Sequence, residues 1–405
     1  MCLAIILMNN KLNMVLVKSM LQRIKMEEKL VVEKFLNSLQ IYLQHNQIFG
    51  FVTFTCTRSN FRSSKLLILY NIILQVLFVS FVSYWLYLVL EADDMLPIYK
   101  NTYLIILFAD FAYLETTWIC TLLKKDKLLE LFKRLIHFDT KCQENSTVID
   151  YKRHKKRLLC YLLARYVALA LVILFSEILV IVSEQEWSFS TGLLVMIFNS
   201  ALSYKASEIV VMLRSRFAIL NKQIRFLNQY LRLKPEGRIS NRRVFISFSK
   251  ICYLHQHLSK SVKLFNEVFG VSLLVLFGNS FLSIVLALFR TAAELQASQI
   301  KWTRIAYMAL ASVPFIFDSI HLCDVCYSTI GTVSWCELNF DWSSQVSKAG
   351  ELIHQIQTED HDIIDEIEMF SLQIANEQVE FNAAGFFPIN YTLVFSVRSV
   401  QVERI

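Results

Sequence analysis

The stretch LLILYNIILQVLFVSFVSYWLYLVL (residues 66–90) contains no charged side chain. An α-helix needs about 20 consecutive apolar residues to cross the ~30 Å hydrocarbon core of a bilayer. This stretch exceeds that length, and a soluble core has no need of an uninterrupted apolar run of this size. It therefore predicts a transmembrane helix and places the chain among the membrane proteins.

More apolar stretches of spanning length follow along the chain, and the last of them is shorter than the others. They are Thr102–Leu123, Leu158–Val182, Trp187–Tyr204, Phe269–Phe289, Ile305–Cys326 and the short Phe381–Val397. The 405 residues are 55% hydrophobic and 19% charged, with a mean hydropathy of +0.43. Transmembrane β-strands would instead show short alternating segments, which we do not see. We predict an all-α polytopic membrane protein with about seven transmembrane helices.

The connecting loops differ in their content of basic residues, and this difference predicts the orientation. Lysine and arginine are dense before residue 66, between the second and third spans, and between the fourth and fifth, whereas Glu91–Asn101 contains only Lys100. Because cytosolic loops carry an excess of basic residues, the N-terminus is predicted to be cytosolic. The net charge of +7 follows from this topology and does not indicate nucleic-acid binding.

The predicted cytosolic segments show helical periodicity. Beyond the fourth span, Ile209, Leu213, Phe217 and Leu220 recur at helical spacing. Helices that extend below the membrane are expected to form an anchor bundle; helices lying on the bilayer surface are the alternative. The expected organisation is a cytosolic N-terminal region (1–65), a seven-helix transmembrane domain (66–397) that includes helical loops 124–157, 205–268 and 331–380, and an atypical charged tail (398–405).

Three short motifs stand at or near the ends of predicted spans. Phe381, Ala384, Gly385, Phe386 and Phe387 match an F-x-x-x-G-F-F pattern, which Pro388 follows. Residues 266–270 read N-x-x-F-G before the fifth span, and residues 217–221 read F-x-x-L-N below the fourth. With these motifs, this number of spans and this orientation, the chain resembles the insect gustatory receptors of the insect chemoreceptor superfamily.

The resemblance implies a function. It implies a subunit of a tetrameric, ligand-gated, cation-permeable channel in the plasma membrane of chemosensory neurons. Such a subunit detects sugars or bitter compounds and mediates acceptance or avoidance. The implied partners are a tastant, cations, membrane lipid and other gustatory receptors in a homo- or heterotetramer, without a cofactor, a metal or nucleic acid. The resemblance also implies that Phe381, Ala384, Gly385, Phe386, Phe387 and Pro388 begin the pore-lining seventh helix.

The seventh apolar run ends earlier than the resemblance implies. From Ala383 to Val397 a helix would rise only ~22 Å, and Arg398, Glu403 and Arg404 follow. Because a charge near the bilayer centre costs several kcal/mol, this run is not expected to cross the membrane in the normal way. We interpret residues 398–405 as intron-coded, from a retained intron or a gene-model error. A truncated, non-conducting isoform that acts as an assembly partner is the alternative function.

Polar and aromatic residues within the predicted spans are candidates for the ligand cavity or the permeation path. Asp110 and Asp318 are acids inside apolar helices, where ionisable residues often face a cavity. Tyr84 and Trp85 could stack on an aromatic tastant, although a place in the interfacial aromatic belt is the alternative. Arg165 is expected to snorkel toward the cytosolic surface.

Other functions have less support in the sequence. A G-protein-coupled receptor would need the opposite orientation, and an inverted-repeat transporter would show internal repeats. Residues 323–326 form a lone CxxC motif without the second pair that a zinc site usually has, so these cysteines are expected to pack. His321, three residues after Asp318, is the one hint of an acyl-transfer enzyme. Without a catalytic constellation in the sequence, we predict no enzyme activity.

Overall fold

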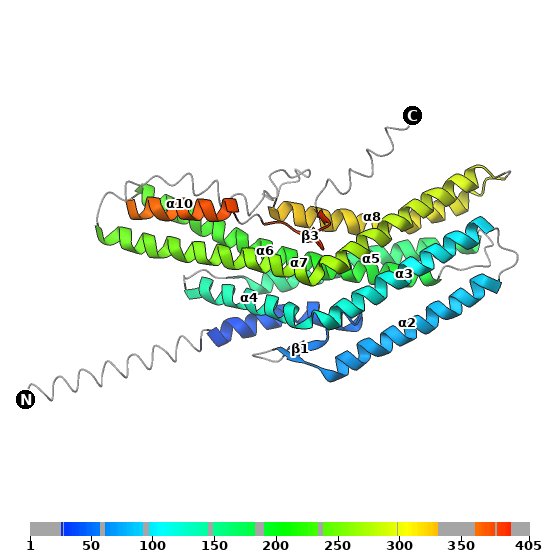
Figure 1. The fold of residues 1–405 in the computed structure, drawn as a ribbon, viewed down its shortest axis with the longest axis horizontal. Coiled ribbons are helices and arrows are strands. Elements are labelled where there is room, and N and C mark those ends of the chain that lie inside the picture. The colour runs from blue at the N-terminus through cyan, green and yellow to red at the C-terminus, as the bar shows by residue number, and fades with distance from the viewer. Residues whose placement is uncertain are drawn as a thin grey trace, which may run out of the picture.

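A computed structural model describes residues 26, 28–56, 61–91, 97–144, 149–182, 190–233, 238–297, 299–330, 361–376 and 379–389. Long helices run side by side along one axis of the molecule (Figure 1). An N-terminal helix covers residues 28–48. It is followed by α2 (Lys65–Glu91), α3 (Pro97–Leu123), α4 (Lys125–Glu144), α5 (Tyr151–Val182), α6 (Ser190–Leu233), α7 (Arg238–Leu295), α8 (Trp302–Ile330) and α10 (His361–Asn376).

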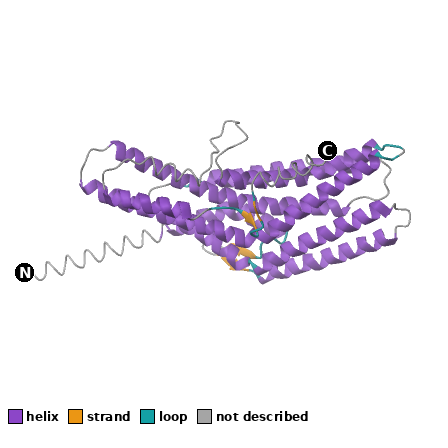
Figure 2. Ribbon diagram, turned by 45° about the horizontal axis from the view of Figure 1, so that its top comes forward, coloured by secondary structure: helices purple, strands orange, loops and turns teal. Residues whose placement is uncertain are grey.

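Two short antiparallel strand pairs interrupt the helical bundle. They lie near the middle of its length (Figure 2). Strand β1 (Phe54–Cys56) pairs with β2 (Phe61–Ser63), and β3 (Asn382–Ala383) pairs with β4 (Phe387–Pro388). The sequence analysis predicted neither pair, because each strand is too short to show an alternating pattern.

The described residues contain six helices that are long and apolar enough to cross a membrane. Helices α2, α3, α5, α7 and α8 each contain one complete predicted span. For the fourth predicted span, residues 187–189 lie outside the described residues, and α6 begins at Ser190. The prediction of an all-α, multi-pass membrane protein is confirmed.

The helices differ in how deeply they are buried, and the difference follows from their place in the bundle. Only 11% of the most apolar window of α2 is buried, compared with 78% of that of α6. Exposed leucine, isoleucine and valine side chains cover α2, as suits a helix that faces lipid. Helix α6 packs against α5, α7 and α8 at the centre of the bundle.

Two helices extend beyond their predicted spans without a break. Helix α6 continues past Tyr204 to Leu233, and α7 begins at Arg238, well before Phe269. The predicted helical continuation after the fourth span is therefore confirmed. Leu213, Phe217 and Leu220 of this continuation are fully buried. Their helical spacing in the sequence therefore marks the face of α6 that packs against the rest of the bundle.

The prediction of a helix over residues 381–389 is wrong. These residues form the β3–β4 hairpin, with Ala384 and Gly385 at positive φ angles of 53° and 78° in its turn. The Gly385 N–H donates to Asn382 Oδ1 at 2.9 Å, and the Ile389 N–H donates to the Phe381 carbonyl at 2.8 Å. Hydropathy counts apolar side chains and does not register a glycine turn closed by an asparagine side chain. Residues 390–397 of the predicted span lie outside the described residues.

Candidate functional site

The side-chain amide of Asn266 in α7 makes two hydrogen bonds to the β3–β4 hairpin and the residue just before it. Asn266 Nδ2 donates a hydrogen bond to the Glu380 carbonyl at 2.6 Å, and the Asn382 N–H donates to Asn266 Oδ1 at 3.2 Å. An asparagine amide has both donors and an acceptor, so this one residue satisfies two backbone groups of the hairpin. The first residue of the N-x-x-F-G motif therefore contacts the F-x-x-x-G-F-F motif.

One turn further along α7, Gly270 allows the hairpin backbone to approach closely. A Cβ atom at Gly270 would lie 2.7 Å from the backbone nitrogen of Ala384 and 3.0 Å from its Cα. These atoms belong to the main chain, so no side-chain rotation would relieve the clash. The last residue of the N-x-x-F-G motif is thus a glycine because the hairpin turn rests on it.

The aromatic residues of the hairpin motif point in different directions. Phe381 is fully buried and meets the Phe265 ring edge-on, with ring centroids 5.2 Å apart. Phe387 meets Phe277 of α7 in the same way at 6.0 Å. Phe386 is 77% exposed, while Ala384, Gly385 and Pro388 are also at the surface. The predicted pore-helix residues therefore form a hairpin that docks on α7 through the first and last residues of the motif, Phe381 and Phe387.

A second polar constellation joins three membrane-spanning helices around Asp318 of α8. Arg165 of α5 forms a buried ion pair with Asp318. Asn199 of α6 donates to Asp318 Oδ2 at 3.2 Å, and Arg165 Nε donates to Ser200 Oγ at 2.7 Å. The expectation that Arg165 snorkels to the surface is wrong, because a buried carboxylate on the neighbouring helix provides its partner.

The remaining sequence candidates have partners other than Asp318. Asp110 of α3 is buried and accepts a hydrogen bond from Asn279 Nδ2 of α7 at 3.0 Å. Tyr84 of α2 is 59% exposed, and Trp85 is half-buried with its ring edge-on to Phe81. Within the described part of the chain, no hydrogen bond or ring contact joins any two of the four candidates. Their role in a ligand cavity stays a prediction.

The predicted packing role of the CxxC cysteines agrees with their surroundings. Cys323 and Cys326 are both fully buried in the bundle core. Among the described residues, no group of three or more metal-ligating side chains comes together. His321 stacks on Phe317 and also contacts the Tyr161 ring, so its surroundings are aromatic.

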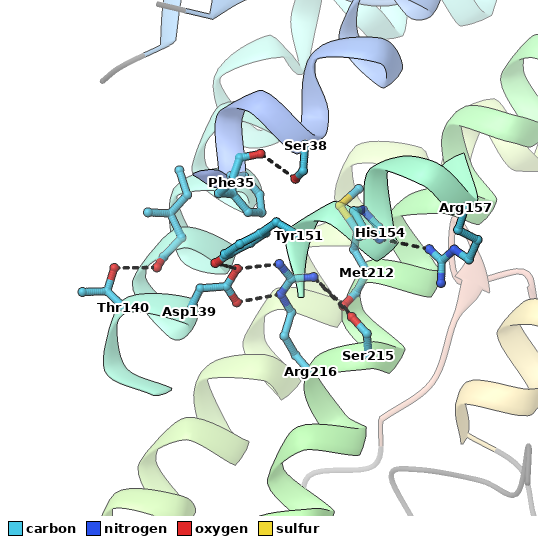
Figure 3. Close-up of polar contacts among 11 residues, drawn as sticks. Phe35, Ser38, Asp139, Thr140, Tyr151, His154, Arg157, Met212, Ser215 and Arg216 are labelled. Carbon is cyan, nitrogen blue, oxygen red and sulfur yellow. Dashed lines mark hydrogen bonds and ion pairs between the residues drawn. The ribbon is translucent and has the colours of Figure 1, made fainter. Parts of the chain in front are cut away.

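The sequence analysis missed a buried ion pair that lies beyond the predicted spans (Figure 3). Arg216 of α6 donates to both carboxylate oxygens of Asp139 of α4, at 3.0 and 2.7 Å, and the Tyr151 hydroxyl donates to Asp139 Oδ2 at 2.9 Å. Burial raises the pKa of Asp139, while Arg216 and Tyr151 oppose that rise. The signal in the sequence was Arg216 itself, a charged residue among the apolar residues of α6. The sequence analysis counted it only as one of the basic loop residues that predict orientation.

Comparison with known proteins places this architecture in a family. The model of the family described as 7tm Chemosensory receptor matches residues 39–400. Gustatory receptor 68a of Drosophila melanogaster is 25% identical over 212 residues, a match that covers 51% of this chain and 51% of that receptor. The chain thus spans about half the length of the curated relative it matches.

Solved structures share the fold across nearly the whole chain. The insect olfactory receptor OR5 from Machilis hrabei superimposes with a TM-score of 0.58 at 13% identity, over 96% of this chain and 97% of that one. Its complex with eugenol gives a TM-score of 0.57 at 15% identity, over 93% and 97% of the two chains. Since the family model matches most of its length, the chain belongs to the 7tm chemosensory receptor family.

Proposed function

We propose that this chain is a gustatory receptor, a subunit of a ligand-gated cation channel that detects small-molecule tastants. The observation that carries the proposal is the docking of the β3–β4 hairpin on α7. Asn266 and Gly270 hold the hairpin beside α7. In this proposal the hairpin belongs to the pore-forming part of the chain, and it receives the movement of α7.

The channel would open when a ligand stabilises one arrangement of the helices over another. A ligand shifts such an equilibrium only by the difference between its affinities for the two states. Helices α5, α6 and α8 are tied together by Arg165 and Asp318, and α8 also packs against α7. We infer that a tastant bound among these helices changes their packing and, through α7, the position of the hairpin.

Asp110 is the acid that we propose as a ligand contact. Its carboxylate accepts one hydrogen bond from Asn279, and a carboxylate has room for several. Asp318, in contrast, already meets Arg165 and Asn199, so we propose that it sets the packing of the helices around the cavity. The complex of the Machilis hrabei receptor with eugenol supports a small organic molecule as the ligand class.

The proposed setting is the plasma membrane of chemosensory neurons, with the N-terminus in the cytosol. The proposed assembly is a tetramer, formed by this chain alone or with other gustatory receptors. Sugars or bitter compounds are the proposed tastants, and acceptance or avoidance is the proposed behavioural outcome.

The test is whole-cell current in cells that express this chain, alone and with a second gustatory receptor, during application of a panel of sugars and bitter compounds. A tastant-evoked cation current that depends on this chain supports the proposal. Surface-expressed chain that gives no current, and that lowers the current of the second receptor, contradicts the proposal and favours a non-conducting assembly partner.

A further inference from the structure

One exposed stripe runs along the whole of α5. Its members recur at steps of three or four positions, the spacing that keeps side chains on one face of a helix. Seven apolar members are between 41% and 75% exposed: Leu159, Leu163, Val167, Leu171, Leu174, Ile178 and Ile181. Only 17% of the most apolar window of α5 is buried. An exposed apolar face of this length suits contact with lipid.

The length of the stripe places its N-terminal end at the membrane surface. From Leu159 to Ile181 a helix rises ~33 Å, close to the ~30 Å thickness of the hydrocarbon core. Lys156 and Lys152 continue the stripe in the same steps, ~5 and ~11 Å beyond Leu159. These distances put Lys156 at the depth of the lipid headgroups and Lys152 at their outer edge, on the side that the basic loops predict to be cytosolic.

Lys152, Arg153 and Lys156 form a basic group at the N-terminus of α5. Residues three and four apart are neighbours on a helix, so Lys156 lies beside both of the others. All three residues are exposed, and among the described residues none of them forms an ion pair with an acid. The nearest acid along the chain, Asp150, accepts the Arg153 backbone N–H at 3.0 Å and so caps the helix.

The other two basic residues of this part of α5 are engaged with neighbouring helices. Lys155 Nζ donates to Asn37 Oδ1 of the N-terminal helix at 2.9 Å. Arg157 pairs with Glu208 of α6, with 3.4 Å between Nη2 and Oε2. Each of these contacts ties α5 to the bundle. The basic group, in contrast, presents its charge outward at the end of the apolar stripe.

The place of the basic group is electrostatically unfavourable for the isolated fold. The N-terminus of a helix carries a partial positive charge, so cations in the first turn are repelled by it. Lys152 and Lys156 also repel each other, because like charges four residues apart destabilise a helix. An anion beside the group relieves both repulsions. The arrangement is therefore complementary to a negatively charged partner.

We propose that the basic group binds the phosphate group of an anionic phospholipid of the cytosolic leaflet, whose acyl chains lie along the apolar stripe of α5. Basic clusters immediately cytosolic of a transmembrane helix are typical sites for such lipids. Leu159 and Leu163 adjoin the lysines on the same face, and only a lipid would use both the charges and this apolar surface. The proposal does not depend on whether the chain conducts ions.

The test measures the tightest binding of phosphatidylserine to the purified full chain in neutral detergent, by native mass spectrometry. Lys152→Gln/Lys156→Gln is expected to weaken binding about 25-fold, or about fivefold for each lysine near an anionic lipid. Lys152→Arg/Lys156→Arg keeps both charges and is expected to keep the affinity.

Lys250→Gln/Lys260→Gln is the matched control. It removes the same charge from two exposed positions of α7, which lie ~29 and ~14 Å before the start of the fifth predicted span at Phe269. It is expected to leave the affinity unchanged. The unfolding temperature of Lys152→Gln/Lys156→Gln is expected to equal or exceed that of the unmodified chain, because the exposed like charges repel each other, and this measurement shows that the fold is intact.

Four results would overturn the proposal. One is unchanged affinity in Lys152→Gln/Lys156→Gln. Another is an equal loss in the α7 control, which would show attraction by net charge alone. The third is equally tight binding of phosphatidylcholine with the same acyl chains. The last is displacement of the lipid by inorganic phosphate at equal affinity, which would show a site for a free anion. Loss of binding confined to the α5 variant, with a preference for phosphatidylserine, would support the lipid site.

Discussion

Gly270 of α7 and Ala384 of the β3–β4 hairpin are in direct main-chain contact, although they are far apart in the sequence. The space between them admits no Cβ atom on Gly270. Each residue belongs to a motif by which the sequence resembles gustatory receptors. The two motifs are therefore two halves of one docking surface, and their residue types follow from the closeness of that contact.

Gly270→Ala is expected to displace the hairpin, because the new Cβ atom would lie 2.7 Å from the Ala384 nitrogen. Overpacking of this kind costs about 1–3 kcal/mol. We expect a lower unfolding temperature and reduced tastant-evoked current at equal surface expression. Gly278→Ala is the matched control, since nothing lies within 4 Å of its Cβ position. Equal stability losses in the two variants would disprove the close contact.

Asn266→Leu is expected to remove both hydrogen bonds between α7 and the hairpin. Glu380 is exposed and Asn382 is half-buried, so water can replace the lost partner and the expected cost is the ordinary net value of about 0.5–1.5 kcal/mol for each hydrogen bond. Faster amide hydrogen exchange at residues 381–389 is the expected signal, measured by mass spectrometry. Glu267→Gln, at the next position on α7, is the control that leaves the hairpin contacts intact. Unchanged exchange in Asn266→Leu would contradict the clamp.

Asp318→Asn and Arg165→Met are each expected to destabilise the bundle strongly. Removal of one partner leaves a buried charge uncompensated, which typically costs about 3–5 kcal/mol. The double variant is expected to lose less than the sum of the single losses, because neither charge remains. Thermal unfolding of all four proteins gives the coupling energy. Arg134→Gln breaks an exposed pair with Glu130 as the control, and additive losses in the double variant would argue against the Arg165–Asp318 pair.

His45 is expected to make stability fall in acid. Burial, together with nearby Arg165, lowers the pKa of His45 to about 4 from its ordinary value of 6.5. Because the lowered pKa favours neutral His45 in the folded state, the stability that His45 contributes to the fold is complete above pH 6.5. This stability is lost as the pH falls toward 4. At ~1.36 kcal/mol for each pKa unit the loss approaches ~3 kcal/mol.

The measurement for His45 is the unfolding temperature between pH 7 and pH 5. His45→Gln is expected to make this dependence shallower without removing it, because glutamine has no proton to gain, whereas burial also lowers the pKa values of His154, His255 and His257. The loss of the 2.7 Å contact with the Tyr166 hydroxyl lowers stability at every pH. His137→Gln, at an exposed position, is the control that keeps the acid sensitivity. A slope in His45→Gln as steep as in the unmodified chain would rule out His45 as its source.

The sequence by itself determined the membrane class, the positions of six spans and the continuation of α6 beyond Tyr204. These features follow from the length and the spacing of apolar residues, which are properties of one segment at a time. The hydrocarbon core demands about 20 apolar residues whatever their neighbours are. The family resemblance was also legible, because motif residues keep their spacing within short segments.

The tertiary structure alone decided which residues meet. The apolar run at residues 381–389 looked like the start of a helix, but Asn266, Gly270 and Phe265 of α7 provide a docking site that favours a hairpin. Likewise, Arg165 pairs with Asp318 and Arg216 with Asp139 across different helices. A buried charge takes its partner from whichever helix packs beside it, and hydropathy and local spacing contain no information about that neighbour.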